Sequence, residues 1–206
     1  MEDKKMDFIG KALEVYMKYG IKSVTMDEMA RQLGVSKKTI YQYVSDKNDL
    51  VEQCIKCAQM IDIEMIKIII NENDNAIDEV LTISKHVSEE LKKIHPSIFF
   101  DLSKYHPGAM EMIKCHKDDF IRDCVKDNLI KGIEQGLYRE NLDVKIISKL
   151  YLFTLDHVLA GELFDSSNVT PEEVYSGVFK YHIHGIASEK GIAYFNNKIN
   201  NKQIKS

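Results

Sequence analysis

The sequence predicts an all-α protein of nine helices, with a three-helix domain over residues 1–46 and a six-helix domain over residues 47–195. Two observations support this fold class. Apolar residues recur at spacings of three and four along most of the chain, which is the period of an amphipathic helix. Helix start and stop signals separate these segments, and the clearest are Thr25, Gly34 and Thr170-Pro171. We expect the polar residues 196–206 to form a disordered tail.

The first domain contains two short helical patterns joined by a glycine. Thr25 is a good N-cap and Glu28 would complete a capping box, so a helix should begin at residue 26. Gly34 follows, where a helix C-terminus favours a residue that adopts positive φ. Ser36 would then cap a second helix. Two helices around such a turn are typical of the helix-turn-helix motif, which binds the DNA major groove.

The second helix of this motif is mostly polar. Only Ile40 and Val44 are clearly apolar in it, so we interpret it as an exposed reading element supported by its neighbours. Lysine and hydroxyl groups suit phosphate oxygens, glutamine can pair with a base edge, and tyrosine can do either. The alternative is a helical hairpin whose polar face is merely solvated. Charge does not decide between them, because residues 1–50 carry nine basic and eight acidic side chains.

The block from Ile9 to Leu50 resembles the N-terminal domain of the TetR family of bacterial transcriptional regulators. The resemblance is contiguous, with the family's spacing and no gap. The matching residues are Ala12-Leu13, Tyr16, Tyr19-Gly20, Val24-Thr25, Met29-Ala30, Gly34-Val35-Ser36, Thr39-Ile40-Tyr41, Tyr43, Lys47 and Leu50. Val44 stands where an aromatic residue is usual and Met29 where isoleucine is common, and both remain apolar. The resemblance implies a DNA-binding protein.

Eight residues of this block are candidate DNA contacts. They are Thr25, Lys37, Lys38, Thr39, Tyr41, Gln42, Tyr43 and Lys47. We expect Lys37, Thr39, Tyr43 and Lys47 to bind phosphates, and Lys38, Tyr41 and Gln42 to meet bases. One short reading helix contacts too few base pairs, so a homodimer is expected. Its two reading helices, about 34–36 Å apart, would occupy successive major grooves of a palindromic operator.

After Leu50 the chain reads as helix throughout. The first of these helices runs from about 46 to 71 and leaves the DNA-binding domain without a flexible linker, so it could carry a displacement between domains. Further helices are expected at 76–94, 98–104, 107–135, 143–164 and 171–188.

The resemblance also implies a dimer interface on the last two helices and a small-molecule pocket in the second domain. Apolar residues at suitable spacing for the interface are Leu150, Leu155, Leu159, Val174, Val178 and Tyr181. Candidate pocket residues are Met60, Met65, Phe99, Phe100, Tyr105, Met110, Phe120, Tyr151, Phe153 and His157. Methionine and aromatic side chains adapt to apolar ligands of different shape. Plain core packing is the alternative for each pocket residue, and it is the commoner one.

We therefore expect a ligand-responsive transcriptional regulator, a homodimeric repressor that is released from its operator by an unknown small molecule. The alternative is a DNA-binding regulator without a small-molecule effector, controlled by a protein partner or by cysteine oxidation. Activation in place of repression stays open, as does the chemistry of the effector.

Other classes of protein are disfavoured. The sequence lacks a glycine-rich phosphate loop, a nucleophile elbow and a zinc signature, so we expect no enzyme, no cofactor and no metal site. Cys54, Cys57, Cys115 and Cys124 lack the spacing of a zinc site and are interpreted as free thiols of a helical core. No apolar run approaches the ~18 residues that a membrane span requires. With no signal peptide at the N-terminus, we expect a cytoplasmic protein.

Overall fold

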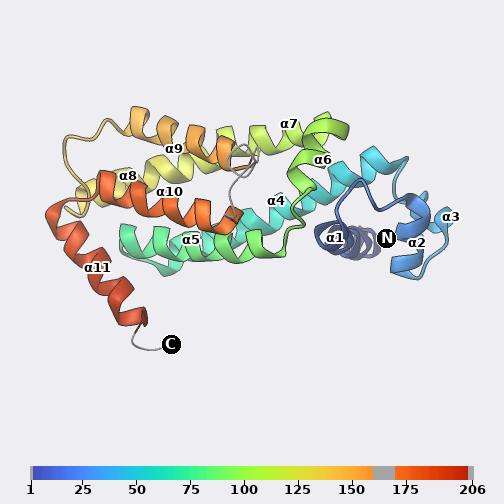
Figure 1. Ribbon diagram of the computed structural model, residues 1–206, viewed down its shortest axis with the longest axis horizontal. Helices are drawn as coiled ribbons and strands as arrows, with labels where there is room; N and C mark the ends of the chain where they lie inside the picture. The colour runs from blue at the N-terminus through green and yellow to red at the C-terminus, as the bar shows by residue number, and fades with distance from the viewer. Residues whose placement is uncertain (1, 160–169, 204–206) are drawn as a thin grey trace. The chain divides into compact units, whose positions relative to one another are not determined.

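The computed structural model describes residues 2–159 and 170–203, and these residues form eleven α-helices and one π-helical turn (Figure 1). The predicted all-α fold class is confirmed. The chain divides into two compact units, each built from two segments. The first unit comprises Met1–Met65 and Lys92–Lys117, and the second comprises Ile66–Leu91 and Asp118–Ser206.

The first unit contains the N-terminal helices together with two helices from the middle of the chain. In order these are α1 (Glu2–Tyr19), α2 (Met26–Leu33), α3 (Lys37–Ile40), the beginning of α4 (Lys47–Glu72), α6 (Ile98–Tyr105) and α7 (Pro107–His116). Buried side chains of all six helices form one core, which includes Tyr16, Met29, Ile40, Leu50 and Leu102. The helix-turn-helix segment therefore shares its core with α4, α6 and α7.

The predicted domain boundary at 46/47 falls inside this first unit. The physical reason is the burial of Leu50, Val51 and Cys54 on α4, and of Leu102 and Ala109 on α6 and α7, in the same core as α1–α3. An apolar helix face must be covered wherever the chain supplies a partner, and here the partner comes from residues far along the sequence.

The second unit contains α5 (Ala76–Lys93, up to Leu91), α8 (Arg122–Glu134), α9 (Val144–Leu159), α10 (Pro171–Ile186) and α11 (Glu189–Gln203). Helix α9 packs against both α8 and α10. The core of this unit includes Ile77, Leu129, Tyr138, Ile183 and Phe195. The predicted helix starts at Thr170 and Ala76 are confirmed, and Thr170 forms the expected capping box with Glu173.

Two expectations about helix extent were wrong. The predicted helix 107–135 is divided into α7, a π-helical turn η1 (Lys117–Ile121) and α8. Residues 196–203, expected in a disordered tail, continue α11, because Phe195 is buried and the Tyr194 hydroxyl donates to Asp78 Oδ2 at 2.6 Å. Residues 160–164, the end of the predicted helix 143–164, lie outside the described ranges, as do the final residues 204–206.

Over residues 2–159 and 170–203, no helix is both long enough and apolar enough to cross a membrane.

Candidate nucleic-acid interface

The turn between α2 and α3 has the geometry that its sequence predicts. The Thr25 Oγ1 accepts the backbone N–H of Glu28 at 3.1 Å, and the Ser36 Oγ accepts that of Thr39 at 3.0 Å. Gly34 lies in the left-handed region with φ 65°. The Glu28 carboxylate does not close the expected capping box, because it accepts hydrogen bonds from Arg31 and Gln32 instead.

The reading element is shorter than predicted. Helix α3 is a single turn that ends at Ile40, and residues 41–43 continue as hydrogen-bonded turns. Ile40 and Val44 are buried and attach this segment to the core. Between these two anchors, Tyr41 and Gln42 are exposed, as are Lys37 and Lys38 before them.

Three of the expected phosphate contacts already have partners inside the protein. Lys37 Nζ lies 3.1 Å from a carboxylate oxygen of Asp27, and both side chains are exposed, so water and salt weaken this pair. The Thr39 hydroxyl lies 2.8 Å from that of Ser36. The Tyr43 ring stacks on Phe8 with centroids 5.1 Å apart, which fixes the ring against α1.

Lys47 is partly buried at the beginning of α4. Its Nζ donates to the backbone carbonyl of Ile21 at 2.7 Å, and burial lowers the pKa of the ammonium group. The side chain therefore connects α4 to the turn between α1 and α2. A phosphate contact by Lys47 would have to share the ammonium group with this carbonyl.

A buried carboxylate that the sequence analysis did not single out fixes the same turn. Asp101 on α6 is only 3% exposed and accepts the backbone N–H of Lys22 at 2.9 Å and the hydroxyl of Ser97 at 3.1 Å. A Cβ added at Gly20, which has φ 80°, would lie 2.7 Å from Ser97 Oγ. The available signal was a single acidic residue in the apolar segment 98–102.

The end of α6 is attached to the start of α4. His106 is 8% exposed, and its Nδ1 lies 2.7 Å from the side-chain oxygen of Asn48. Burial lowers the pKa of His106, and the nearby charge of Lys47 lowers it further. Both effects favour the neutral imidazole, which lies beside the residues that follow the α2–α3 motif.

The predicted pocket residues are divided between the two units. Six of the ten belong to the first unit and four, from Phe120 onward, to the second. Met60, Met65, Phe100, Tyr105 and Phe153 are exposed, and Met110 packs against the core of the first unit. The rest are partly buried. The Tyr151 ring lies tilted against His182, with 4.4 Å between the ring centroids.

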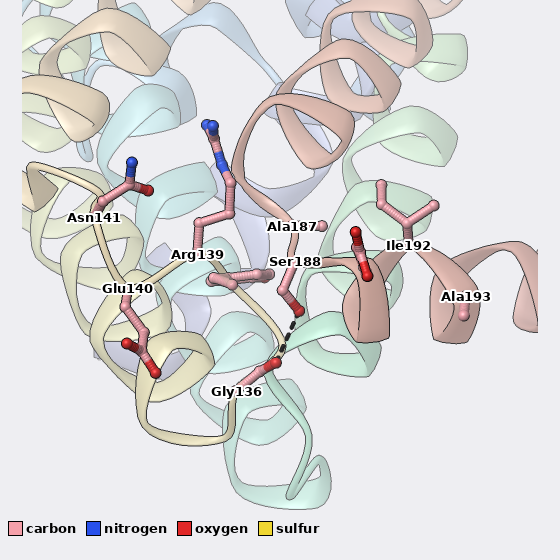
Figure 2. A pocket seen from close by; sticks show the side chains of 10 residues that line it. Gly136, Arg139, Glu140, Asn141, Ala187, Ser188, Ile192 and Ala193 are labelled. Atoms are coloured by element: carbon pink, nitrogen blue, oxygen red, sulfur yellow. Dashed lines mark hydrogen bonds between the residues drawn. The ribbon is translucent and has the colours of Figure 1, made fainter.

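The second unit has a cavity of about 820 Å³ between the α8–α9 connection and the α10–α11 junction. Figure 2 shows the side chains that line it. Two of its polar side chains donate hydrogen bonds to backbone carbonyls. Ser188 Oγ donates to the Gly136 carbonyl at 2.8 Å, and the Arg139 guanidinium donates to the carbonyl of Gly185. A second cavity, of about 430 Å³, lies in the first unit beside Phe8 and Tyr43. Neither cavity is lined by any of the ten predicted residues.

The predicted dimer residues divide into two groups. Leu150 is 57% exposed and Tyr181 is 84% exposed, whereas Leu155, Val174 and Val178 are partly buried. The side chain of Leu159 lies outside the described part. Ile146 and Phe153 were not assigned to the interface, although they lie one turn before and one turn after Leu150 and are also exposed.

Cys54 and Cys57 do not resemble the cysteines of a thiol sensor. Cys54 and Cys57 are buried, and burial raises the pKa of both thiols, which suppresses the reactive thiolate. Cys115 is exposed. Across the described ranges, no three His, Cys, Asp or Glu side chains gather as metal ligands would.

Comparison with known proteins points in one direction. Residues 8–54 match the family model described as bacterial regulatory proteins, tetR family. The chain is 26% identical over 172 residues to the HTH-type transcriptional regulator YvaF of Bacillus subtilis, covering 82% of this chain and 88% of that protein. It is 25% identical over 190 residues to the fatty acid metabolism regulator protein of the same organism, covering 89% and 95%. The crystal structure of FadR from Bacillus subtilis in complex with stearoyl-CoA superimposes with a TM-score of 0.65 at 23% identity, covering 88% of this chain and 98% of that chain.

Proposed function

Because the chain belongs to the TetR family of bacterial transcriptional regulators, we propose that this DNA-binding protein is a homodimeric repressor released from a palindromic operator by a small molecule. The observation that carries the proposal is the family match over residues 8–54, which covers the turn whose caps and exposed reading residues are described above. Cytoplasmic localisation follows from this role, since bacterial DNA lies in the cytoplasm.

The exposed residues of the reading element suggest two kinds of DNA contact, one with base edges and one with phosphates. Lys38, Tyr41 and Gln42 are exposed, and we assign them to base edges. Lys37, Thr39, Tyr43 and Lys47 are assigned to phosphates, with Thr25 at the start of α2 beside them. Phosphate binding would replace the weak pair between Lys37 and Asp27.

The second unit offers faces for dimerisation. Ile146, Leu150 and Phe153 form an exposed apolar stripe on α9, and Tyr181 is exposed on α10. Burying such side chains against a second copy would contribute about 1.5–3 kcal/mol for each one fully buried.

Two exposed glycines of α10 support the same interface. Gly177 and Gly185 lie one turn before and one turn after Tyr181, and a Cβ at either would meet no other described side chain or neighbouring element within 4 Å. Glycine inside a helix costs about 1 kcal/mol relative to alanine. Packing among the described residues does not require these two glycines, whereas close approach of a partner helix would.

Leu150→Glu tests the dimer. The charged side chain would be desolvated in the interface, so the variant should sediment as a monomer and lose operator binding. Lys149→Glu, at the adjacent exposed position, is a control for added charge on α9. A Leu150→Glu variant that remains dimeric would remove this face from the interface.

For the effector, we propose a long-chain acyl-coenzyme A. The relatives support this class, since one is named a fatty acid metabolism regulator and the FadR structure contains stearoyl-CoA. Inside the first unit, the bonds of Asp101 and His106 give α6 a direct hold on the turn after α1 and on the start of α4. A bound state in which α6 shifts would therefore disturb the reading motif.

The test begins with selection of operator sequences from random duplexes by the purified protein. Gel-shift titrations of the selected operator are then repeated with stearoyl-CoA, with stearate and with coenzyme A. We expect a palindromic site and release by the acyl-CoA. Selection of no preferred sequence would contradict the repressor proposal, and release by none of the three compounds would contradict the effector class.

A further inference from the structure

A cluster of aromatic and cationic side chains lies at the surface of the first unit, on α6 and the turn after α1. Phe100 is 58% exposed and Tyr105 is 37% exposed, and their rings meet edge to face with centroids 6.5 Å apart. Lys104 Nζ lies 5.2 Å from the Phe100 centroid and 5.5 Å from that of Tyr105. Lys22 Nζ lies 5.0 Å from the Tyr105 centroid. We call these four residues the cation–aromatic patch.

The two lysines of the patch form no ion pair among the described residues. The nearby Asp101 is buried and is occupied by the backbone N–H of Lys22 and the hydroxyl of Ser97. Two ammonium groups therefore lie beside two exposed aromatic rings, and within the described ranges neither has a carboxylate at ion-pair distance.

We propose that the cation–aromatic patch binds a free nucleotide, with its phosphates at Lys22 and Lys104 and its base against the Phe100 ring. A nucleotide presents both chemistries that the patch complements, since its phosphates attract ammonium groups and its base stacks on an aromatic side chain. Duplex DNA offers phosphates but keeps its bases stacked inside the helix, so it would leave the exposed rings unused. This chemistry distinguishes the patch from the reading element.

The inference deepens the proposed function and rests on it for the identity of the natural ligand. Coenzyme A ends in a phosphorylated adenosine diphosphate, so an acyl-coenzyme A carries a nucleotide of the required chemistry. Because of the position of the patch, a ligand bound there would lie close to the turn that precedes α2. Lys22 belongs to the turn that leads to the Thr25 cap of α2, and its N–H is bound by Asp101. Phosphate at Lys22 would act on the segment directly before the reading motif.

Isothermal titration of the full chain tests the patch with three probes, namely adenosine diphosphate, coenzyme A and pantetheine, which lacks the nucleotide. The first two should bind and pantetheine should not. The double variant Lys22→Gln/Lys104→Gln should bind both nucleotides about tenfold more weakly or worse, and Phe100→Ala should weaken them several-fold. Lys114→Gln, an exposed lysine on α7, is the matched control and should bind as the wild type does.

Each alternative outcome is decisive. Absence of nucleotide binding, or unchanged binding by the double variant, overturns the proposal. If the double variant loses operator affinity with no nucleotide present, the patch contacts the DNA backbone and the proposal is also wrong. If stearoyl-CoA releases the operator equally well from the wild type and from the double variant, the effector proposal is supported and nucleotide binding at the patch is contradicted. If stearoyl-CoA releases the operator from neither protein while adenosine diphosphate binding depends on the patch, nucleotide binding at the patch is supported and the effector class is contradicted.

Discussion

The α2–α3 motif and α6 both present lysine and tyrosine side chains to solvent, but they are held in different ways. The motif is stabilised by bonds between near neighbours, such as Thr25 to Glu28 and Ser36 to Thr39. Helix α6 is held by bonds that span the chain, with Asp101 reaching a residue 79 positions away and His106 one 58 positions away. The comparison indicates that the conformation of the reading element depends on residues close in sequence. The helices that support it are held by residues far away in the sequence.

The largest effect on stability should come from a bond between residues that are far apart in sequence. Asp101→Ala leaves the Lys22 N–H and the Ser97 hydroxyl without their buried acceptor, so the free energy of unfolding should fall by about 2–3 kcal/mol. Urea denaturation measures this. Asp27→Ala, which removes only an exposed pair with Lys37, should cost less than about 0.5 kcal/mol. Equal losses of unfolding free energy in the two variants would contradict the distinction between the buried long-range bond and the exposed pair.

A base contact should produce the next largest effect. Gln42→Ala should lower affinity for the best operator by about 1–3 kcal/mol and relax the preference at one base pair, because an exposed amide can pair with a base edge. Gel-shift titration against single-base operator variants measures both quantities. A uniform loss across all sequences would show that this side chain contacts the backbone of DNA.

Lys47 has two expected roles, one in DNA binding and one in stabilising the turn after α1. As a phosphate contact, its loss in Lys47→Ala should weaken binding to all sequences and reduce the slope of affinity against salt by about one. As a brace for the Ile21 carbonyl, its loss should lower the free energy of unfolding by about 1 kcal/mol. Salt-dependent gel shifts and denaturation together separate the roles. An unchanged salt slope with reduced stability would leave the bracing role alone.

The smallest effect should fall on the local turn. Gly34→Ala forces an alanine to φ 65° where no atom crowds its Cβ, so the cost should be the backbone strain alone, about 1 kcal/mol. Gly10→Ala, inside α1 with equally open surroundings, should stabilise the protein by roughly 0.5–1 kcal/mol. Thermal unfolding of the two variants should therefore shift in opposite directions.

Sequence reasoning worked where the cause of structure is near in the chain. The caps at Thr25, Ser36 and Thr170 and the glycine at 34 were all predicted, because a helix end needs a hydrogen-bond acceptor or a positive φ within a few residues. It also predicted that the second helix of the motif would expose its lysines and Gln42, since that segment has too few apolar residues to bury.

It failed where a partner comes from far away. Nothing in the spacing of Asp101 indicates that it accepts a backbone bond from the turn after α1. The polar composition of residues 196–203 concealed a helix, because two aromatic residues just before them pack on the second core and on Asp78. The ten pocket candidates share a residue type, and residue type alone does not indicate that six of them belong to the first unit and four to the second.

By itself, the sequence determined the all-α class, the helix-turn-helix and the exposed residues of the reading element, since each depends on periodicity and on capping within one or two turns. Only the tertiary structure decided that α6 and α7 share a core with the reading motif, that Lys47 and Asp101 both fix the turn after α1, and that two lysines gather on two exposed rings. These arrangements depend on which helices meet, and the periodicity of a helix shows which face is buried without naming its partner.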